Sequence, residues 1–144
     1  CYDSEAWVTA TAAGQVVRSE RGIVALDLDG DSFEQTGWVI VYLHITDQDR
    51  VKVGEYLDVG DFVGHPSCDG GYSTGTHAHI ARKFNGEWMT ADGPIPFVLS
   101  GWQVHEGSRA YKGTLTRGDD TVTASSVGAS HSKIVRERAQ NSEQ

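Results

Sequence analysis

Apolar and polar residues alternate with a period of two along most of the chain, and helical periodicity is nearly absent. The clearest run, "WVIVYLHI" at residues 38–45, predicts a buried strand. Shorter runs predict further strands at 7–18 (interrupted at Gly14), at 22–28, twice within 51–64, and at 77–84. The Asn85-Gly86 pair is a hairpin signal that returns the chain through "EWMT". The pattern therefore predicts an all-β domain with a mostly antiparallel sheet.

The composition fits a small β domain and excludes some partners. The 144 residues are enough for one domain with a single core. Seventeen glycines against three prolines favour many tight turns. No apolar run approaches the roughly 20 residues that a membrane span needs. A net charge of −8 argues against a nucleic-acid partner, which would require a basic surface. We expect a monomer with no nucleic-acid partner and no membrane span.

The end of the chain differs in composition from the rest. From about Thr114 the large apolar residues become rare, and the sequence is rich in Ser, Thr and Gly before it becomes charged. Such segments bury too little apolar surface to fold alone. We therefore predict a β domain over residues 1–113 and a flexible tail over residues 114–144.

Alternation also predicts where three histidines point. In "HAHIARKF", His77 and His79 share one face, and two strand residues advance about 6.6 Å, so the imidazoles project side by side. They could reach one small site, or they could simply be solvated. In the strand at 38–45, alternation assigns one set to the core (Val39, Val41, Leu43 and Ile45) and the other set to the opposite face (Trp38, Ile40, Tyr42 and His44). Because alternation puts each histidine off the core-facing side, we expect His44, His77 and His79 to converge in one groove.

The segment "DLDGD" places Asp27, Asp29 and Asp31 at alternate positions. Carboxylate oxygens at this spacing could bind Ca²⁺. The segment is not an EF-hand loop, because its glycine is the fourth residue and its twelfth residue is Trp38. A solvated acidic hairpin turn is the alternative interpretation.

The chain contains two cysteines, Cys1 and Cys68. They could be free buried thiols, or they could form the single disulfide of an exported protein. The first residue is not Met and no signal-peptide pattern is present, so we expect the chain to be a piece of a longer protein.

The order of several motifs resembles the lysostaphin-type (LytM, or β-lytic) zinc metalloendopeptidases. The motifs are "ATAAGQVV", "YLH", "VKVGEYLDVGDFVG", "STGTHAHI" and "NGEW", within residues 6–88. "STGTHAHI", with Tyr-x-His upstream, is the most specific. The resemblance implies the duplicated-hybrid-motif-like fold, in which an antiparallel sheet forms a groove. It further implies a secreted or cell-envelope protein that cleaves peptide bonds of bacterial peptidoglycan, or of other Gly-containing peptides.

The same resemblance assigns roles to the three histidines. It makes His79 a zinc ligand, and it makes His77 and His44 the imidazoles that orient the attacking water and stabilise the oxyanion. A catalytic zinc keeps three protein ligands and a water whose pKa it lowers. In the family the other two ligands, a His and an Asp, lie upstream of the strand that corresponds to "WVTATAAGQVV". Residues 1–6, which precede this strand here, contain no histidine.

Two explanations follow from the missing ligands. Either they lie upstream of Cys1 in a longer protein, or the chain is a degenerate relative that binds without cutting. We favour the first, because His44, His77 and His79 are all present. We therefore expect one Zn²⁺ in the complete protein and no activity from this chain alone.

The resemblance also bears on the cysteines and leaves other functions open. Exported relatives often carry a cysteine at the place of Cys68, and Cys1 is the available partner, so we predict a Cys1–Cys68 disulfide. The alternatives to a peptidase are a non-catalytic cell-wall-binding or regulatory module on the same fold, and an extracellular β domain stabilised by Ca²⁺.

Overall fold

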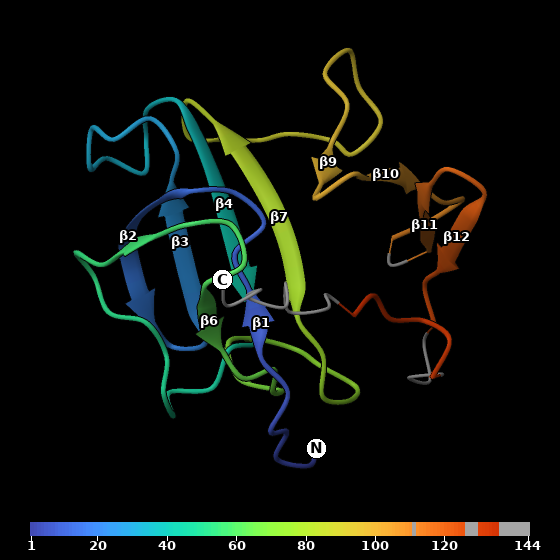
Figure 1. The fold of residues 1–144 in the computed structure, drawn as a ribbon, viewed down its shortest axis with the longest axis horizontal. Coiled ribbons are helices and arrows are strands. Elements are labelled where there is room, and N and C mark those ends of the chain that lie inside the picture. The colour runs from blue at the N-terminus through green and yellow to red at the C-terminus, as the bar shows by residue number, and fades with distance from the viewer. Residues whose placement is uncertain (111, 126–129, 136–144) are drawn as a thin grey trace, which may run out of the picture.

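A six-stranded antiparallel sheet forms the centre of the molecule in the computed structural model, which describes residues 1–110, 112–125 and 130–135 (Figure 1). The strand order is β5-β2-β3-β4-β7-β8. The strands are β2 (Gly14–Glu20), β3 (Ile23–Asp27), β4 (Trp38–Leu43), β5 (Tyr56–Leu57), β7 (His79–Phe84) and β8 (Glu87–Trp88). All regular elements of the described residues are strands, and every pairing is antiparallel, which confirms the predicted fold class.

Two tight turns set the register of the sheet. Asn85 and Gly86 have φ angles of 49° and 79°, and they join β7 to β8 so that Phe84 pairs with Glu87. Positive φ at both central residues defines the hairpin turn whose twist matches the strands. Arg21 (φ 48°) and Gly22 (φ 78°) do the same between β2 and β3. The hairpin predicted at Asn85-Gly86 is confirmed.

The main hydrophobic core lies between one face of this sheet and a two-stranded pair, β1 (Val8–Thr9) with β6 (Phe62–Gly64). Figure 1 shows this pair crossing in front of the central strands. The buried members of the core are Ala10, Val16, Val24, Leu26, Ile40, Tyr42, Ile45, Leu57, Val63 and Phe97. A smaller cluster of Ala25, Val39 and Val41 covers the opposite face.

This arrangement corrects the predicted faces of the strand at residues 38–45. Val39 and Val41 are buried as expected, but they belong to the smaller cluster. Ile40 and Tyr42, which were expected to face away from the core, lie in the main core. Both faces of β4 are therefore buried, and alternation alone could not show which face has the larger core.

A third sheet contradicts the prediction of a flexible tail that begins at Thr114. It has the order β12-β11-β10-β9, with β9 (Val98–Leu99), β10 (Trp102–Glu106), β11 (Gly113–Arg117) and β12 (Asp120–Thr123). Leu115 pairs with Val122 across β11 and β12, among threonines whose branched side chains favour strands. Because this segment is rich in Ser, Thr and Gly, we weighed its composition and overlooked its alternation of apolar and polar residues. Residues 126–129 and 136–144 of the predicted tail lie outside the described residues.

The described residues contain no helix that is long and apolar enough to cross a membrane.

Candidate active site

The three histidines that the sequence singled out come together at one end of β4 and β7. The ring centroids of His44 and His77 are 4.4 Å apart, and those of His44 and His79 are 6.4 Å apart. His44 is buried, His79 is half-buried and His77 is exposed. The cluster is thus fixed at its inner end and open to solvent at its outer end, as a site for an external ligand requires.

The backbone at His44 explains how its ring reaches the other two. Leu43 pairs directly with His79, and paired residues of antiparallel strands share a face. Simple alternation would therefore place His44 on the face opposite to His79. His44 instead has a φ of 65°, a conformation that non-glycine residues rarely adopt. The alternation is reversed at this residue, and Ile45 accordingly packs in the main core with Tyr42.

The convergence was predicted, but the reason given for it was incomplete. His44 was placed with Trp38, Ile40 and Tyr42 by regular alternation, whereas the left-handed residue moves it to the other side of the sheet. Such conformations cost on the order of 1 kcal/mol or more and are frequent at functional sites. Ser67 stabilises this one, because its backbone N–H and its hydroxyl donate to the His44 carbonyl over 2.6 and 3.0 Å.

Backbone carbonyls fix the tautomers of two of the rings. Nδ1 of His44 lies 2.7 Å from the Asp69 carbonyl oxygen, and Nδ1 of His77 lies 2.8 Å from that of Gly75. A carbonyl oxygen can only accept, so each Nδ1 carries the proton and donates it. Nε2 of each neutral ring then presents a lone pair. Both imidazoles can accept a proton at Nε2 and, once protonated, donate there.

His79 differs from its neighbours in its electrostatic surroundings. Partial burial lowers the pKa of its imidazole below 6.5, and the nearby His44 and His77 lower it further, because a second positive charge beside them would be unfavourable. The ring therefore stays neutral around pH 7. A neutral imidazole is the form that can coordinate a metal ion.

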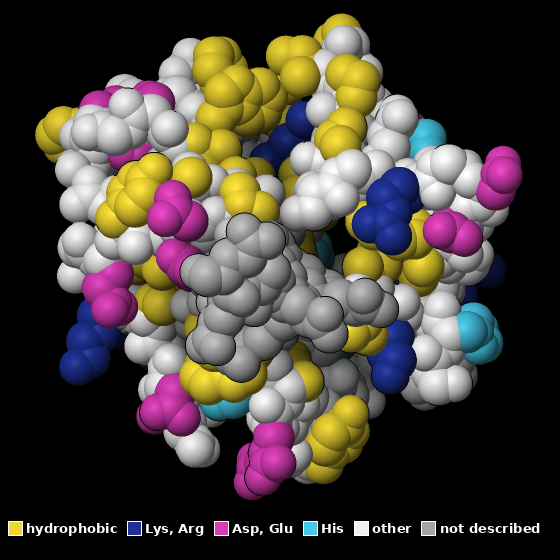
Figure 2. Space-filling model, viewed as in Figure 1, with side chains coloured by type: hydrophobic (Ala, Val, Ile, Leu, Met, Phe, Trp, Pro, Cys, Tyr) yellow, Lys and Arg dark blue, Asp and Glu magenta, His cyan; other side chains and the backbone are white. Residues whose placement is uncertain are grey.

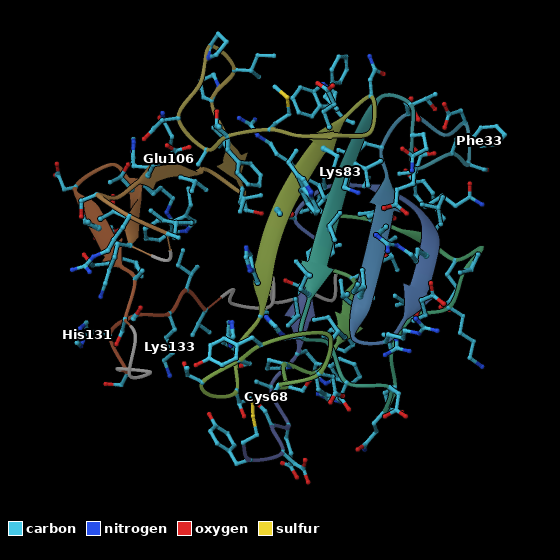
Figure 3. All side chains as sticks on the ribbon, turned by 180° about the vertical axis from the view of Figure 1, so that it is seen from behind. Phe33, Cys68, Lys83, Glu106, His131 and Lys133 are labelled. Atoms are coloured by element: carbon cyan, nitrogen blue, oxygen red, sulfur yellow. A yellow bond between two sulfur atoms is a disulfide. The ribbon has the colours of Figure 1, made fainter. Side chains whose placement is uncertain are left out.

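The loop before β7 is tied to the start of the chain. Cys1 and Cys68 form a disulfide, with Cα atoms 6.2 Å apart, as predicted. Figure 3 shows Cys68 beside the lower ends of β4 and β7. The Tyr2 N–H donates to Thr76 Oγ1 over 3.2 Å, and the Thr76 hydroxyl donates to the Tyr2 carbonyl over 2.7 Å. Tyr2 thus lies beside the residue that precedes His77.

Sequence reasoning missed the residues that orient the rings. Besides Ser67 and Asp69, these include Ser73, whose Oγ lies 3.2 Å from Nδ1 of His77. All three lie in an irregular loop, where no repeating pattern of residues predicts which way a side chain points. The close spacing of small residues in "HPSCDGGYSTGT" was the sequence feature that could have indicated a tightly folded loop beside the histidines.

The described residues do not complete a zinc site with three protein ligands. Of the ligand set that the resemblance implies, they supply His79. Among all described His, Cys, Asp and Glu side chains, the group that brings three ligand atoms within 4.8 Å of one another is Asp27, Asp29 and Asp31. A catalytic zinc needs three protein ligands around one point, so the three histidines do not substitute for the expected ligands.

Asp27 is the last residue of β3, and Asp29 and Asp31 lie in the β3–β4 connection, at the other end of β4 from His44. The buried Asp27 carboxylate accepts the backbone N–H groups of Asp29 (3.2 Å) and Ser32 (2.9 Å), and Asp31 accepts that of Phe33 (2.9 Å). These bonds give the acids a role in shaping the turn. Calcium has no support beyond the proximity of the carboxylates.

A hydrogen bond with Asp27 and, to a smaller extent, loss of solvation raise the pKa of Asp29 to about 6. Hydrogen bonds from Thr36 and from the Phe33 backbone lower the pKa of Asp31. The turn therefore holds one carboxyl that protonates easily and one that resists protonation.

Comparison with known proteins places this geometry in context. No family model matches the chain. The chain is 26% identical over 118 residues to the beta-lytic metalloendopeptidase of Achromobacter lyticus, a match that covers 77% of this chain. It spans 29% of the length of that relative. The solved structure of pseudoalterin, described as a novel M23 metalloprotease from the deep sea, matches with a TM-score of 0.63 at 19% identity. That match covers 83% of this chain and 70% of the other.

The chain thus has the fold of an M23 peptidase and resembles the β-lytic enzymes in sequence.

Proposed function

We propose that the chain forms the histidine-bearing part of the active site of a zinc metalloendopeptidase. The convergence of His44, His77 and His79, with two tautomers fixed by backbone carbonyls, is the observation that supports it most directly. The proposed substrate is a peptide of bacterial peptidoglycan or another Gly-containing peptide. A disulfide is typical of exported proteins, so we propose an extracellular or cell-envelope location.

In this proposal each histidine has a different role, which follows from its surroundings. His79, held neutral by its lowered pKa, is the metal ligand. Nε2 of His77, on the exposed ring, accepts a proton from the attacking water. His44, on the buried ring, would carry a second proton at Nε2 besides the Nδ1 proton bound to Asp69, and this Nε2–H would donate to the oxyanion that develops on the scissile carbonyl. The other two zinc ligands are proposed to come from a segment upstream of Cys1. Tyr2 already lies beside Thr76, so such a segment would enter next to the cluster.

The test uses the 144-residue chain and a longer protein that contains it with its natural upstream sequence. We expect the longer protein to hold about one zinc per molecule by elemental analysis and to release new amino termini from purified peptidoglycan. The 144-residue chain should do neither. Stoichiometric zinc in the short chain would contradict the ligand assignment.

Variants of the longer protein separate the histidine roles. His77→Ala should abolish peptide cleavage and keep most of the metal, whereas His79→Ala should lose both. His131→Ala, which removes an exposed histidine outside the cluster, is the control and should retain both. Equal zinc loss in the His77 and His79 variants would contradict the separate roles.

A second candidate is a non-catalytic cell-wall-binding module on the same fold. It is favoured by one observation: the described residues supply one of the three implied zinc ligands. If the longer protein sediments with peptidoglycan but releases no amino termini at saturating zinc, this second function holds and the first fails.

A further inference from the structure

A cavity of about 300 Å³ lies on the opposite face of the central sheet from His79. Its walls include Trp38 and Ile40 of β4, Arg82 of β7, and Phe97. Ile40 pairs with Arg82 across the two strands, whereas His79 pairs with Leu43, so Arg82 and His79 face opposite sides. The cavity is therefore separate from the candidate active site. Its volume is at the lower end of the range for small-molecule sites.

The lining is apolar except at two side chains. Thr11 carries a hydroxyl and Arg82 carries a charge, and the remaining lining side chains are aliphatic or aromatic. Ile95 and Val98 leave 48% and 52% of their surfaces exposed, so apolar groups also surround the opening. Figure 2 shows a hollow in the upper half of the molecule, with hydrophobic side chains on both sides and basic side-chain surface at its floor.

Arg82 is buried without an acidic partner. Only 5% of its surface is exposed. Its Nη1 donates to the Pro96 carbonyl (3.0 Å), and its Nη2 donates to those of Thr90 (2.9 Å) and Ile95 (2.5 Å). Its Nε is buried and has no hydrogen-bond partner among the described residues. No carboxylate of those residues forms an ion pair with it.

The neighbours of Arg82 therefore solvate the guanidinium without neutralising it. The three carbonyls are uncharged dipoles, and the rings of Phe97 and Trp38, with centroids 4.6 and 5.4 Å from Cζ, offer only the weak negative charge of their faces. A buried cation without a counter-ion is costly, and Arg is the side chain whose geometry best fits a carboxylate. Burial lowers the pKa of Arg82, which agrees with an environment that lacks negative charge.

We propose that this cavity binds a small carboxylate with a compact apolar body, whose negative charge lies against Arg82 and whose apolar part contacts Trp38, Ile40 and Phe97. The ligand supplies the counter-ion that the described chain does not provide, and the apolar walls favour a carboxylate over inorganic anions, which have no apolar surface to bury. A free acid and the carboxyl terminus of a peptide share this chemistry. The site does not depend on the proposed peptidase activity.

The experiment compares two probes of equal size on the 144-residue chain. N-acetyl-leucine carries a carboxylate, and N-acetyl-leucinamide replaces it with a neutral amide. Titrations followed by NMR should show the acid binding at least about tenfold more tightly than the amide, because a charge-assisted hydrogen bond is stronger than a neutral one. The shifted signals should include those of the Trp38 and Phe97 rings. Equal affinities, or shifts centred elsewhere, would overturn the proposal.

Variants test whether the preference for the acid arises at Arg82. Arg82→Met should remove the preference for the acid, and Arg82→Lys should keep part of it. Arg117→Met is the matched control, because Arg117 also lies 4.6 Å from an aromatic ring, that of Trp102, but does not line the cavity. It should leave the preference unchanged. If Arg82→Met does not fold, Ala12→Phe still decides: Ala12 lines the cavity, and a larger side chain there should block both probes while Arg82 remains. Unchanged binding in Ala12→Phe contradicts the proposed location.

A further pair of probes distinguishes the two sources of the carboxylate. Ala-Ala-Leu with a free carboxyl terminus is compared with its carboxamide. If the free peptide binds more tightly than N-acetyl-leucine, the natural ligand class is a peptide terminus. If it binds more weakly, the class is a free small acid.

Discussion

The imidazole rings of His44 and His77 lie 4.4 Å apart, and each donates its Nδ1 proton to a carbonyl of the same loop. The loop that includes Asp69 and Gly75 thus sets the tautomer of the ring that follows β4 and of the ring two residues before the start of β7. We predict that neutral His44 and His77 are Nδ1–H tautomers. Long-range ¹H–¹⁵N spectra of ¹⁵N-histidine-labelled protein at pH 8 should show this pattern for both rings. An Nε2–H tautomer in either ring would contradict the geometry.

The imidazole of His79 should titrate below the ordinary histidine pKa of about 6.5. Its folded pKa is lowered, first by burial and then by His44 and His77, so the folded state binds fewer protons than the unfolded state just below pH 6.5. The stability that this group contributes is full above pH 6.5 and is lost as the pH falls through the folded pKa. Replacing His44 by Gln should raise the pKa of His79 part of the way back. An NMR titration measures both values, and an unchanged pKa in the variant would remove His44 as a cause.

Gly22 should tolerate substitution worse than Gly30, although both have nearly the same φ (78° and 77°). A Cβ at Gly22 would meet the backbone of Gly70 at 2.6 Å and of Asp69 at 2.7 Å, whereas a Cβ at Gly30 meets nothing within 4 Å. Gly30→Ala therefore measures the cost of the backbone conformation alone, roughly 1 kcal/mol. Gly22→Ala adds a clash worth about 1–3 kcal/mol.

The same clash would push the Asp69 carbonyl away from His44. Denaturant unfolding measures the two losses of stability, and the His44 ring signals report the displacement. If Gly22→Ala and Gly30→Ala are equally destabilised, the contact between the β2–β3 turn and the Asp69 loop contributes nothing to the free energy of unfolding.

Asp29→Asn should stabilise the protein more at pH 7 than at pH 4. The pKa of Asp29 is raised from 3.8 to about 6 by its hydrogen bond with Asp27, so the folded state prefers the protonated form. Its contribution to stability therefore falls as the pH rises from about 4 to 6, and Asn removes that dependence. Asp31 has a pKa lowered mainly by hydrogen bonds from Thr36 and the Phe33 backbone, and it contributes in the opposite direction. Thermal unfolding at the two pH values measures the difference; a constant difference would contradict the raised pKa.

Loss of the Cys1–Cys68 disulfide should destabilise the chain and loosen the site. Its partners are 67 residues apart in sequence, and closing a loop of this size restricts the unfolded chain by about 4 kcal/mol in the entropic model. In the Cys1→Ala/Cys68→Ala variant we also expect altered His44 ring signals, because Asp69 follows Cys68 directly. Non-reducing peptide mapping of the oxidised protein is the control, and two freely alkylatable thiols there would disprove the bridge.

The sequence predicted those parts of the fold that follow from regular geometry. Alternation located β4, and Asn85-Gly86 located the β7–β8 hairpin, because both depend on short-range rules. The left-handed backbone of His44 depends on Ser67, which lies far along the chain, so no local pattern could predict it. The strands around Leu115 and Val122 were missed because composition was weighed above alternation. The cavity beside Arg82 requires three carbonyls from the irregular segment after β8, which periodicity does not describe.

The pairing of β4 with β7 also has a consequence for the order of folding. β2, β3 and β4 join neighbours that are close in sequence, so this meander can form from local contacts. β7 pairs with β4 only after residues 44–78 have closed into a loop, and such non-local contacts form more slowly. We therefore expect the histidine cluster to assemble late. A chain that has emerged from the ribosome only as far as β6 would have its first hairpins and no site, so any activity must await the final third of the β domain.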